Sequence, residues 1–253
     1  MNKELLSLNK IIKRFPIDNQ KIFDSGQVRD NFFYALDDIS FSIEQGECTI
    51  IAGANGSGKS LLMTIAAGLE EPTSGKVKTT TGVGLVFQEP DAQILGETPR
   101  EDIAFGPRNL GLSRKEAELR VEEALSQTGL SQRADFPARS LSGGEKRRLA
   151  AAGVLAMNAE IIIFDEPYAN MDFPGVVQVN RLFQKLIGDG KTVIILTHEL
   201  EKCFALCSRF IALSKGEKVL DSCVSEDVLE NIENFGIRNP LKNNSLKIED
   251  LLW

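Results

Sequence analysis

The sequence predicts an α/β fold in which helices cover both faces of a parallel β-sheet. Continuous apolar runs at residues 161–164 and 192–196 are typical of strands at the centre of such a sheet, because those strands are buried on both sides. A third strand, at residues 48–52, leads into a glycine-rich stretch and then into the helical pattern of residues 61–67. This order of strand, glycine loop and helix predicts a ligand site at the end of the third strand.

The glycine-rich stretch has the residue pattern of a phosphate-binding loop. Glycines let the backbone curl so that successive N–H groups point at phosphate oxygens, and the next helix adds the positive end of its dipole. Lys59 supplies a cation for the outer phosphates, and Ser60 offers a hydroxyl to Mg²⁺. A turn with an exposed Lys and Ser is the alternative, which the flanking strand and helix disfavour. The residues expected to hold a nucleoside triphosphate are Gly53, Ala54, Asn55, Gly56, Ser57, Gly58, Lys59 and Ser60.

Length, charge and cysteine content limit the possible functions. The 253 residues, 42% of them hydrophobic, suffice for one α/β domain with a subdomain. The net charge of −7 argues against a nucleic-acid partner, and the spacing of the four cysteines predicts buried free thiols in a reducing compartment. No apolar run approaches the ~18 residues of a membrane span, and the polar N-terminus does not resemble a signal peptide. Any membrane role is therefore expected from the cytoplasmic side, through a partner.

The remaining strands are predicted with patterns of different clarity. Residues 39–43 alternate strictly between apolar and polar side chains and predict a half-buried strand, whereas residues 5–14 mix the two without a clear period. Residues 83–87 predict another strand. Near the C-terminus, a hairpin is predicted between residues 210–213 and 218–220.

The segment from about residue 90 to residue 157 has helical character. A capping box that starts at Ser113 predicts a helix that ends at Gly129. A second capping box, which starts at Ser142, precedes a helix at residues 146–157.

Polar side chains that could act on a phosphate follow the predicted strands. Asp165 and Glu166 come directly after the run at residues 161–164, and His198, the single histidine, follows another buried strand. At the carboxyl edge of a parallel sheet, Asp165 is suited to hold Mg²⁺ through its water shell, and Glu166 can orient or deprotonate the attacking water. Gln88 can reach Mg²⁺ or that water, and His198 can contact the γ-phosphate. Taken alone, each could instead be a solvated strand end or a structural side chain.

These motifs occur in the order and spacing of the ATP-binding-cassette (ABC) ATPases. They resemble, in chain order, the Walker A loop at residues 53–60, the Q-loop at Gln88, the signature motif at residues 141–145, Walker B at residues 161–166 and the switch histidine at His198. The signature motif is the discriminating element, because ordinary phosphate-loop enzymes lack it. Finer stretches resemble the ATPase subunits of energy-coupling-factor (ECF) and cobalt/nickel-type importers, at residues 86–93, 102–112 and 141–156.

The resemblance implies a P-loop NTPase fold. It implies a RecA-like parallel-sheet core, an antiparallel β part at the N-terminus and an inserted α-helical subdomain at about residues 90–157. The ABC ATP-binding domain would span residues 1–226, followed by a C-terminal tail at residues 227–253. ATP and Mg²⁺ are the implied ligands. Phe15 resembles the aromatic that stacks on adenine, with Tyr34 as the alternative, although Phe15 could also be a core residue.

The resemblance also implies a dimer of two ATPases, either two copies of this chain or this chain with a related one. The domains would stack head to tail around two ATP molecules. The helix tip at Ser142, Gly143 and Gly144 would then point at the γ-phosphate bound by the partner's Walker A loop, while Asp172 matches the D-loop that crosses the seam.

Three residues depart from the commonest pattern of the family at this seam. Glu145 stands where Gln is usual, Tyr168 replaces a small residue, and Asn170 stands where Gly or Ser is common. Glu145 can serve as the acceptor of the Ser142 capping box, but it also brings a negative charge near the partner's phosphate.

A cluster of carboxylates suggests where a membrane subunit could bind. Residues 89–102 include Glu89, Asp91, Glu97, Glu101 and Asp102. In the family, this side receives the coupling helices of the transmembrane subunit, which carry arginines, so an acidic groove is our hypothesis. A solvated acidic face is the alternative.

The resulting prediction is an ATPase subunit of an ECF-type importer for a vitamin or a transition-metal ion such as cobalt or nickel. Its partners would be a transmembrane coupling (T) subunit and a substrate-binding membrane (S) subunit, and this chain would lie at the cytoplasmic face of the membrane. One alternative is an ABC ATPase of DNA repair or translation, but these typically carry a long coiled-coil insertion or two cassettes, and neither is present. A non-catalytic nucleotide sensor is disfavoured by the presence of Glu166 and His198.

Overall fold

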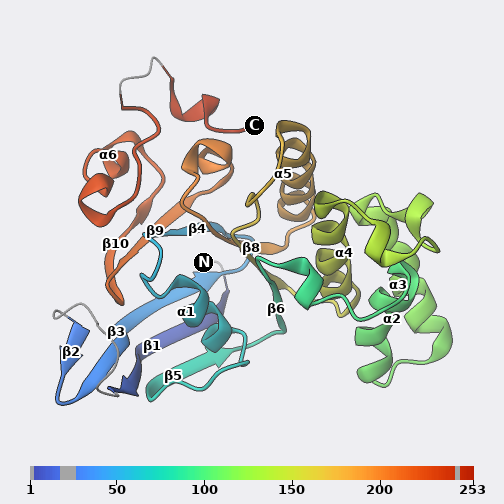
Figure 1. Cartoon of the computed structure of the whole chain (residues 1–253), viewed down its shortest axis with the longest axis horizontal. Coiled ribbons are helices and arrows are strands. Elements are labelled where there is room, and N and C mark those ends of the chain that lie inside the picture. The colour runs from blue at the N-terminus through green and yellow to red at the C-terminus, as the bar shows by residue number, and fades with distance from the viewer. Residues whose placement is uncertain (1–2, 18–26, 243–245) are drawn as a thin grey trace.

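A computed structural model of the chain describes residues 3–17, 27–242 and 246–253 (Figure 1). Two sheets lie side by side, and α2, α3 and α4 form a separate lobe next to them. This arrangement confirms the predicted α/β fold with a parallel core, an N-terminal antiparallel sheet and inserted helices. No helix in the described ranges has both the length and the apolar character needed to cross a bilayer.

The larger sheet carries the nucleotide-binding motifs. Its strands, in the order β10-β9-β4-β8-β7-β6, are β4 (Cys48–Ala52), β6 (Val83–Val86), β7 (Ile161–Asp165), β8 (Thr192–Leu196), β9 (Arg209–Ser214) and β10 (Glu217–Cys223). All run parallel except β10, which pairs antiparallel with β9 as the predicted hairpin. Every residue of β4, β7 and β8 is buried, which explains their continuous apolar sequences.

The smaller sheet packs an apolar face against the larger one. It is antiparallel, in the order β2-β3-β1-β5, with β1 (Glu4–Pro16), β2 (Val28–Arg29), β3 (Phe32–Glu44) and β5 (Ser74–Thr79). In β3, Ile39, Phe41 and Ile43 are buried, as their alternation predicts. Residues 5–14 are also strand, although they showed no period. The register against β3 shifts between Leu8 and Ile11, and such a bulge interrupts the alternation of inward and outward side chains.

Helices complete the layers. The α-helices are α1 (Lys59–Ala66), α2 (Pro99–Asn109), α3 (Arg114–Thr128), α4 (Gly143–Ala156), α5 (Phe173–Gly188) and α6 (Glu226–Leu229). Single 3₁₀ turns are η2 (Pro90–Ala92), η3 (Ser131–Arg133), η4 (Ala138–Ser140), η5 (Leu200–Lys202), η6 (Phe204–Leu206), η7 (Ile232–Phe235) and η8 (Ile248–Asp250). Both predicted capping boxes are present, and Gly129 ends α3 at φ +69°. Because Ser142 is itself the N-cap, α4 begins three residues before the start expected from the sequence.

The C-terminal segment packs against the core rather than trailing from it. Apolar side chains from this polar stretch are buried against α5 and the larger sheet, namely Val228, Leu229, Ile232, Ile237 and Leu251. Asn180 of α5 donates through Nδ2 to the carbonyl oxygen of Trp253 at 2.8 Å, and its Oδ1 accepts from the Tyr168 hydroxyl at 2.7 Å. Tyr168 is fully buried, so this departure from the family pattern belongs to the packing beneath the site. The division into domain and tail stays a prediction.

The cysteine prediction holds for three of the four residues. Cys48, Cys203 and Cys207 are buried free thiols, whereas Cys223 at the end of the edge strand β10 is exposed. Burial raises the pKa of the Cys203 and Cys207 thiols, because the thiolate is poorly solvated there. The expectation of a buried thiol was wrong for Cys223, because an edge strand leaves alternate side chains in solvent.

Candidate nucleotide-binding site

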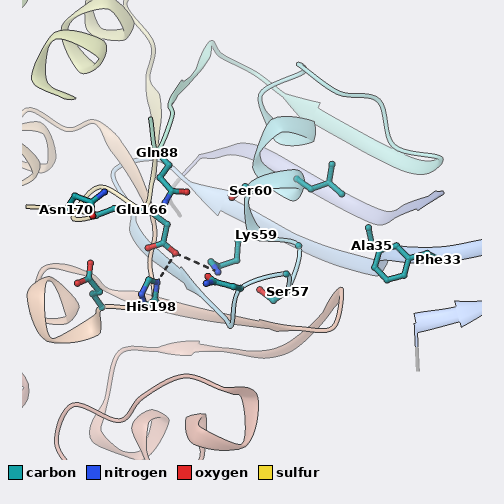
Figure 2. Close-up of a pocket in the computed structure, with 15 residues that line it drawn as sticks. Phe33, Ala35, Ser57, Lys59, Ser60, Gln88, Glu166, Asn170 and His198 are labelled. Atoms are coloured by element: carbon teal, nitrogen blue, oxygen red, sulfur yellow. Dashed lines mark hydrogen bonds and ion pairs between the residues drawn. The ribbon is translucent and has the colours of Figure 1, made fainter. Parts of the chain in front are cut away.

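A pocket of about 630 Å³ opens at the carboxyl ends of β4, β6, β7 and β8 (Figure 2). It is lined by residues 55–61 together with Phe33, Ala35, Gln88, Glu166, Ala169, Asn170, His198 and Glu199. The glycine loop, Gln88, Glu166 and His198, which are far apart in the sequence, therefore meet at one site. They do so because parallel strands end at the same edge of the sheet.

The loop needs glycine where its backbone passes close to other atoms. A Cβ on Gly58 would lie 2.6 Å from the Leu36 Cδ2 atom and 2.9 Å from the carbonyl oxygen of Ala35, and Gly58 has φ +99°. A Cβ on Gly53 would lie 2.4 Å from the carbonyl oxygen of Leu213. These contacts leave no room for a side chain, so the loop can curl over the N-terminus of α1 only with glycine at both positions.

Lys59 holds a buried ammonium inside this loop. Its Nζ donates to the carbonyl oxygens of Gly53 at 2.7 Å and Ala54 at 3.3 Å, and lies 3.9 Å from the Glu166 Oε1 atom. Burial lowers the pKa of Lys59, and the nearby Glu166 and Asp165 carboxylates oppose that shift. A bound phosphate would supply the negative charge that a buried cation requires.

Glu166 and His198 form the second part of the site. The His198 Nδ1 and Glu166 Oε1 atoms are 3.1 Å apart, which is hydrogen-bonding distance (Figure 2). Glu166 is buried and has φ +43°, a left-handed conformation that non-glycine residues rarely adopt. Its N–H donates to the carbonyl oxygen of Leu196 at 2.9 Å, which fixes the carboxylate beside β8. Strain of this kind is typical of functional sites, and here it directs the carboxylate into the pocket.

Asp165 and Ser60 fit a magnesium ion. Asp165 is largely buried, and its Oδ1 atom has no hydrogen-bond partner among the residues described. The pKa of Asp165 is raised above its usual value, because burial disfavours the charged carboxylate. A hydrogen bond from the Ser60 side chain offsets part of this rise. An orphaned carboxylate oxygen beside a hydroxyl is a donor set that suits a hard cation. Across the described ranges, no group of three or more His, Cys, Asp and Glu side chains could hold a metal ion. Phosphate oxygens and water molecules are the other ligands that Mg²⁺ commonly takes in such sites.

Among the described residues, Phe33 is the one phenylalanine or tyrosine that lines the pocket, and the sequence analysis did not identify it. Figure 2 shows it at the end of the pocket away from Glu166. Phe15 is paired with Phe33 in the β1–β3 register, so both side chains lie on one face of the sheet, but Phe15 is not a lining residue. Tyr34 is not one either, and the Arg29 guanidinium carbon lies 4.2 Å from its ring centroid. Phe33 is therefore placed to contact a base in the pocket, and adenine stacking by Phe15 or by Tyr34 stays a prediction. The aromatic run of residues 32–34 is the signal that could have found it.

The signature residues lie away from this pocket. Ser142 caps α4, its Oγ accepts from the Glu145 N–H at 3.3 Å, and Ser142 and Gly143 are exposed. Glu145 completes the capping box by accepting from the Ser142 N–H at 2.8 Å, and also pairs with Arg133 at 3.2 Å. These hydrogen bonds hold the pKa of Glu145 below its usual value. Within the described part of the chain, neither Ser142, Gly143 nor Gly144 lines the pocket. The helix tip is therefore free to face a second molecule.

The residues that match the D-loop follow β7 and Glu166 in the chain. Asp172 caps α5 by accepting from the Gly175 N–H at 3.0 Å, and it does not line the pocket. Asn170 does line it, at φ +58°. Asn tolerates this left-handed conformation better than most residues do, which accounts for Asn at a position where Gly is common.

Comparisons with known proteins agree with this geometry. The ABC transporter family model matches residues 36–169, more than half of the chain. The cobalt import ATP-binding protein CbiO of Rhodobacter capsulatus is 41% identical over 225 residues, covering 82% of this chain and 80% of the relative. The chain belongs to the ABC transporter ATPase family. The energy-coupling factor transporter ATP-binding protein EcfA of Methanocaldococcus jannaschii is 38% identical, with 79% of this chain and 77% of the relative covered.

Solved ABC ATPase structures share the fold over most of this chain. The cbiO1 protein of Clostridium perfringens, part of the ABC transporter complex cbiONQ, has a TM-score of 0.76 at 29% identity and covers 95% of this chain and 97% of its own. The ATP-binding cassette MJ0796, in a dimeric post-hydrolysis state bound to ADP and Pi, has a TM-score of 0.74 at 27% identity and covers 87% of this chain and 99% of its own. The ABC ATPase fold that the motifs implied is confirmed.

In the acidic segment at residues 89–102, two of the five carboxylates are paired with other groups of the same chain. Asp91 Oδ1 pairs with the Lys146 Nζ of α4 at 2.6 Å. Asp102 Oδ1 accepts the N–H groups of Leu95 at 2.7 Å and Gly96 at 2.9 Å, so it shapes the turn before α2. The exposed carboxylates that remain are Glu89, Glu97 and Glu101. A docking role for this segment stays a hypothesis that rests mainly on these three.

Proposed function

We propose that this ATPase binds and hydrolyses ATP to power an ECF-type importer for a vitamin or a transition-metal ion. The observation that carries the proposal is the Glu166–His198 hydrogen bond beside Lys59 in the phosphate-loop pocket. The printed functions of the relatives, cobalt import and energy coupling, support the importer class. They do not favour the alternative of DNA repair or translation.

The proposed mechanism assigns a task to each side chain in the pocket. Lys59 and the loop N–H groups bind the phosphates, while Ser60 and Asp165 would hold Mg²⁺, which neutralises phosphate charge when bound. Glu166 orients the attacking water and accepts its proton. His198, hydrogen-bonded to Glu166, contacts the γ-phosphate. Gln88 follows the neighbouring strand β6 and lines the same pocket, where it would contact Mg²⁺ or the attacking water.

Two ATPases would be needed to complete each ATP site. The tip of α4 is exposed and does not line the pocket described in its own chain, whereas the positive end of the helix dipole suits a phosphate. A dimer with a second copy or with a related ATPase would bring this tip to the partner's γ-phosphate, and the dimeric MJ0796 structure supports such an arrangement. ATP would close the dimer, and hydrolysis would reopen it.

Replacing Glu145 by Gln is expected to maintain or strengthen ATP-dependent dimerisation. The amide oxygen can still accept the Ser142 N–H, so the capping box survives, while the negative charge near the partner's phosphate disappears. The measurement is the dimer fraction on size-exclusion chromatography with ATP. Glu116→Gln, which makes the same change in the capping box of α3, is the matched control and should have no effect. A clear loss of dimer in Glu145→Gln alone would refute this account.

The importer proposal also requires a T subunit and an S subunit in the membrane, with this ATPase at the cytoplasmic face. A tagged chain isolated from its native membranes in mild detergent should retain both, and their identification by mass spectrometry would define the cargo class. Recovery of the chain with DNA-repair or translation factors instead would contradict the proposal.

Reversing the charge at Asp91 and Glu97 together should release the T subunit without abolishing ATP binding. Both carboxylates are exposed, and lysines there would repel the arginines of a coupling helix. Co-purification measures the first effect and nucleotide titration the second. Because Asp91 also pairs with Lys146, the single variant Glu97→Lys separates the docking effect from disruption of α4. Retention of the T subunit in both variants would count against an acidic docking groove.

A further inference from the structure

Arg147 connects the signature helix to the nucleotide pocket of its own chain. It lies in the second turn of α4, and its Nη2 donates to the carbonyl oxygen of Ala169 at 2.7 Å and to that of Gln88 at 3.4 Å. Gln88 and Ala169 both line the pocket. One guanidinium nitrogen therefore joins the Q-loop and the stretch before the D-loop to the helix whose tip faces away from that pocket.

The neighbouring residue reinforces this connection. Lys146 pairs with Asp91, three residues beyond Gln88, so the start of α4 holds the Q-loop segment at two points. Arg148 differs: it contacts the Gln178 side chain of α5 and touches neither loop in the contacts described. The first turns of α4 are therefore connected to the Q-loop segment by one hydrogen bond and one ion pair.

The burial of the Arg147 charge is only partly compensated by contacts within the described part of the chain. Arg147 is half-buried, its Nε is buried without an acceptor, and no carboxylate in the described part of the chain pairs with it. Burial lowers the pKa of Arg147, which marks an unfavourable environment for the charge. A buried donor without a partner opposes folding, so the side chain is better explained by what its two carbonyl contacts connect.

We infer that Arg147 is a positioning residue that couples the two ATP sites of the dimer. The inference rests on the proposed function, because the tip of α4 must contact the partner's ATP. When the partner's ATP binds the tip of α4, this helix moves. Arg147 moves with it and shifts Gln88 and Ala169 in the pocket of the chain to which Arg147 belongs. Binding at one site thereby prepares the other for hydrolysis, and the two sites act cooperatively.

The test measures hydrolysis against ATP concentration in the dimeric ATPase as isolated from cells. Wild type is expected to show a Hill coefficient near 2. Arg147→Ala should lower it to near 1 and reduce kcat at least fivefold, while the Kd for a fluorescent ATP analogue at the isolated monomer changes less than twofold. Arg120→Ala is the matched control, because Arg120 also donates to a backbone carbonyl, that of Ala156 at 3.3 Å, and no hydrogen bond or ion pair joins it to a pocket residue in the described ranges. It should keep the wild-type Hill coefficient.

Arg147→Gln provides a second variant if the alanine change prevents folding. Its side chain is too short to bridge both carbonyls, so it should lose cooperativity in the same way. An unchanged Hill coefficient in the Arg147 variants, an equal loss in Arg120→Ala, or a wild-type coefficient of 1 would overturn the inference while the proposed function stands. Absence of ATP hydrolysis by the wild-type dimer would instead overturn the proposed function.

Discussion

Replacing Glu166 by Gln is expected to slow ATP hydrolysis by a factor of about 10²–10⁴, the usual contribution of a general base. The amide keeps the size of the side chain but cannot accept a proton from the attacking water. Lys59, Ser60 and the loop N–H groups are untouched, so ATP should still bind. Phosphate release measures the first effect, and titration with a fluorescent ATP analogue measures the second.

The chain offers a matched control for this prediction at the other end of the same strand. Glu160 precedes β7, as Glu166 follows it, but Glu160 is exposed and lies away from the pocket. Glu160→Gln should retain wild-type hydrolysis. If Glu166→Gln did so too, another group would have to activate the water, and His198 would be the first to test.

Replacing Lys59 by Ala is expected to weaken ATP binding by about 2–5 kcal/mol, the usual loss when one partner of a buried charged pair is removed. That range corresponds to about 30- to 4,000-fold in Kd. The ammonium is buried and already near the Glu166 carboxylate, so it meets the phosphates with little competing solvent. The Kd for a fluorescent ATP analogue is the direct measurement.

Lys191→Ala is the control for the Lys59 variant. Lys191 also donates from its ammonium to a backbone carbonyl, that of Ala159 at 2.9 Å, but it precedes β8 and lies at the opposite edge of the sheet. Its replacement should leave ATP affinity unchanged. Tight ATP binding by Lys59→Ala would mean that the loop N–H groups alone supply the affinity.

Features encoded by neighbouring residues could be predicted from the sequence. The continuous apolar run of residues 161–164 and the alternation of residues 39–43 each reflect a local burial pattern, so both strands were found. The capping boxes at Ser113 and Ser142 involve residues only three positions apart, and both are present. The bulged strand β1 was missed, because its period is interrupted by pairing with β3.

Within the site, residues at strand ends could be placed in advance, because parallel strands share one ligand-binding edge. Glu166 and His198 meet for this reason. Phe33 was missed, since its position over the pocket depends on how the antiparallel sheet packs beside the loop. The partner of Asp91 could not be predicted either, because Asp91 pairs with Lys146, a residue 55 positions away in the sequence.

The sequence by itself determined the phosphate loop, the polar side chains at the strand ends and the capped helix at Ser142, because each is a short pattern whose chemistry follows from its own residues. Only the tertiary structure decided that Phe33 lines the pocket, that the C-terminal segment is buried against α5, and that Arg147 joins α4 to two pocket residues. These features arise from contacts between distant segments. Such contacts depend on the packing of whole sheets and helices, which no local pattern encodes.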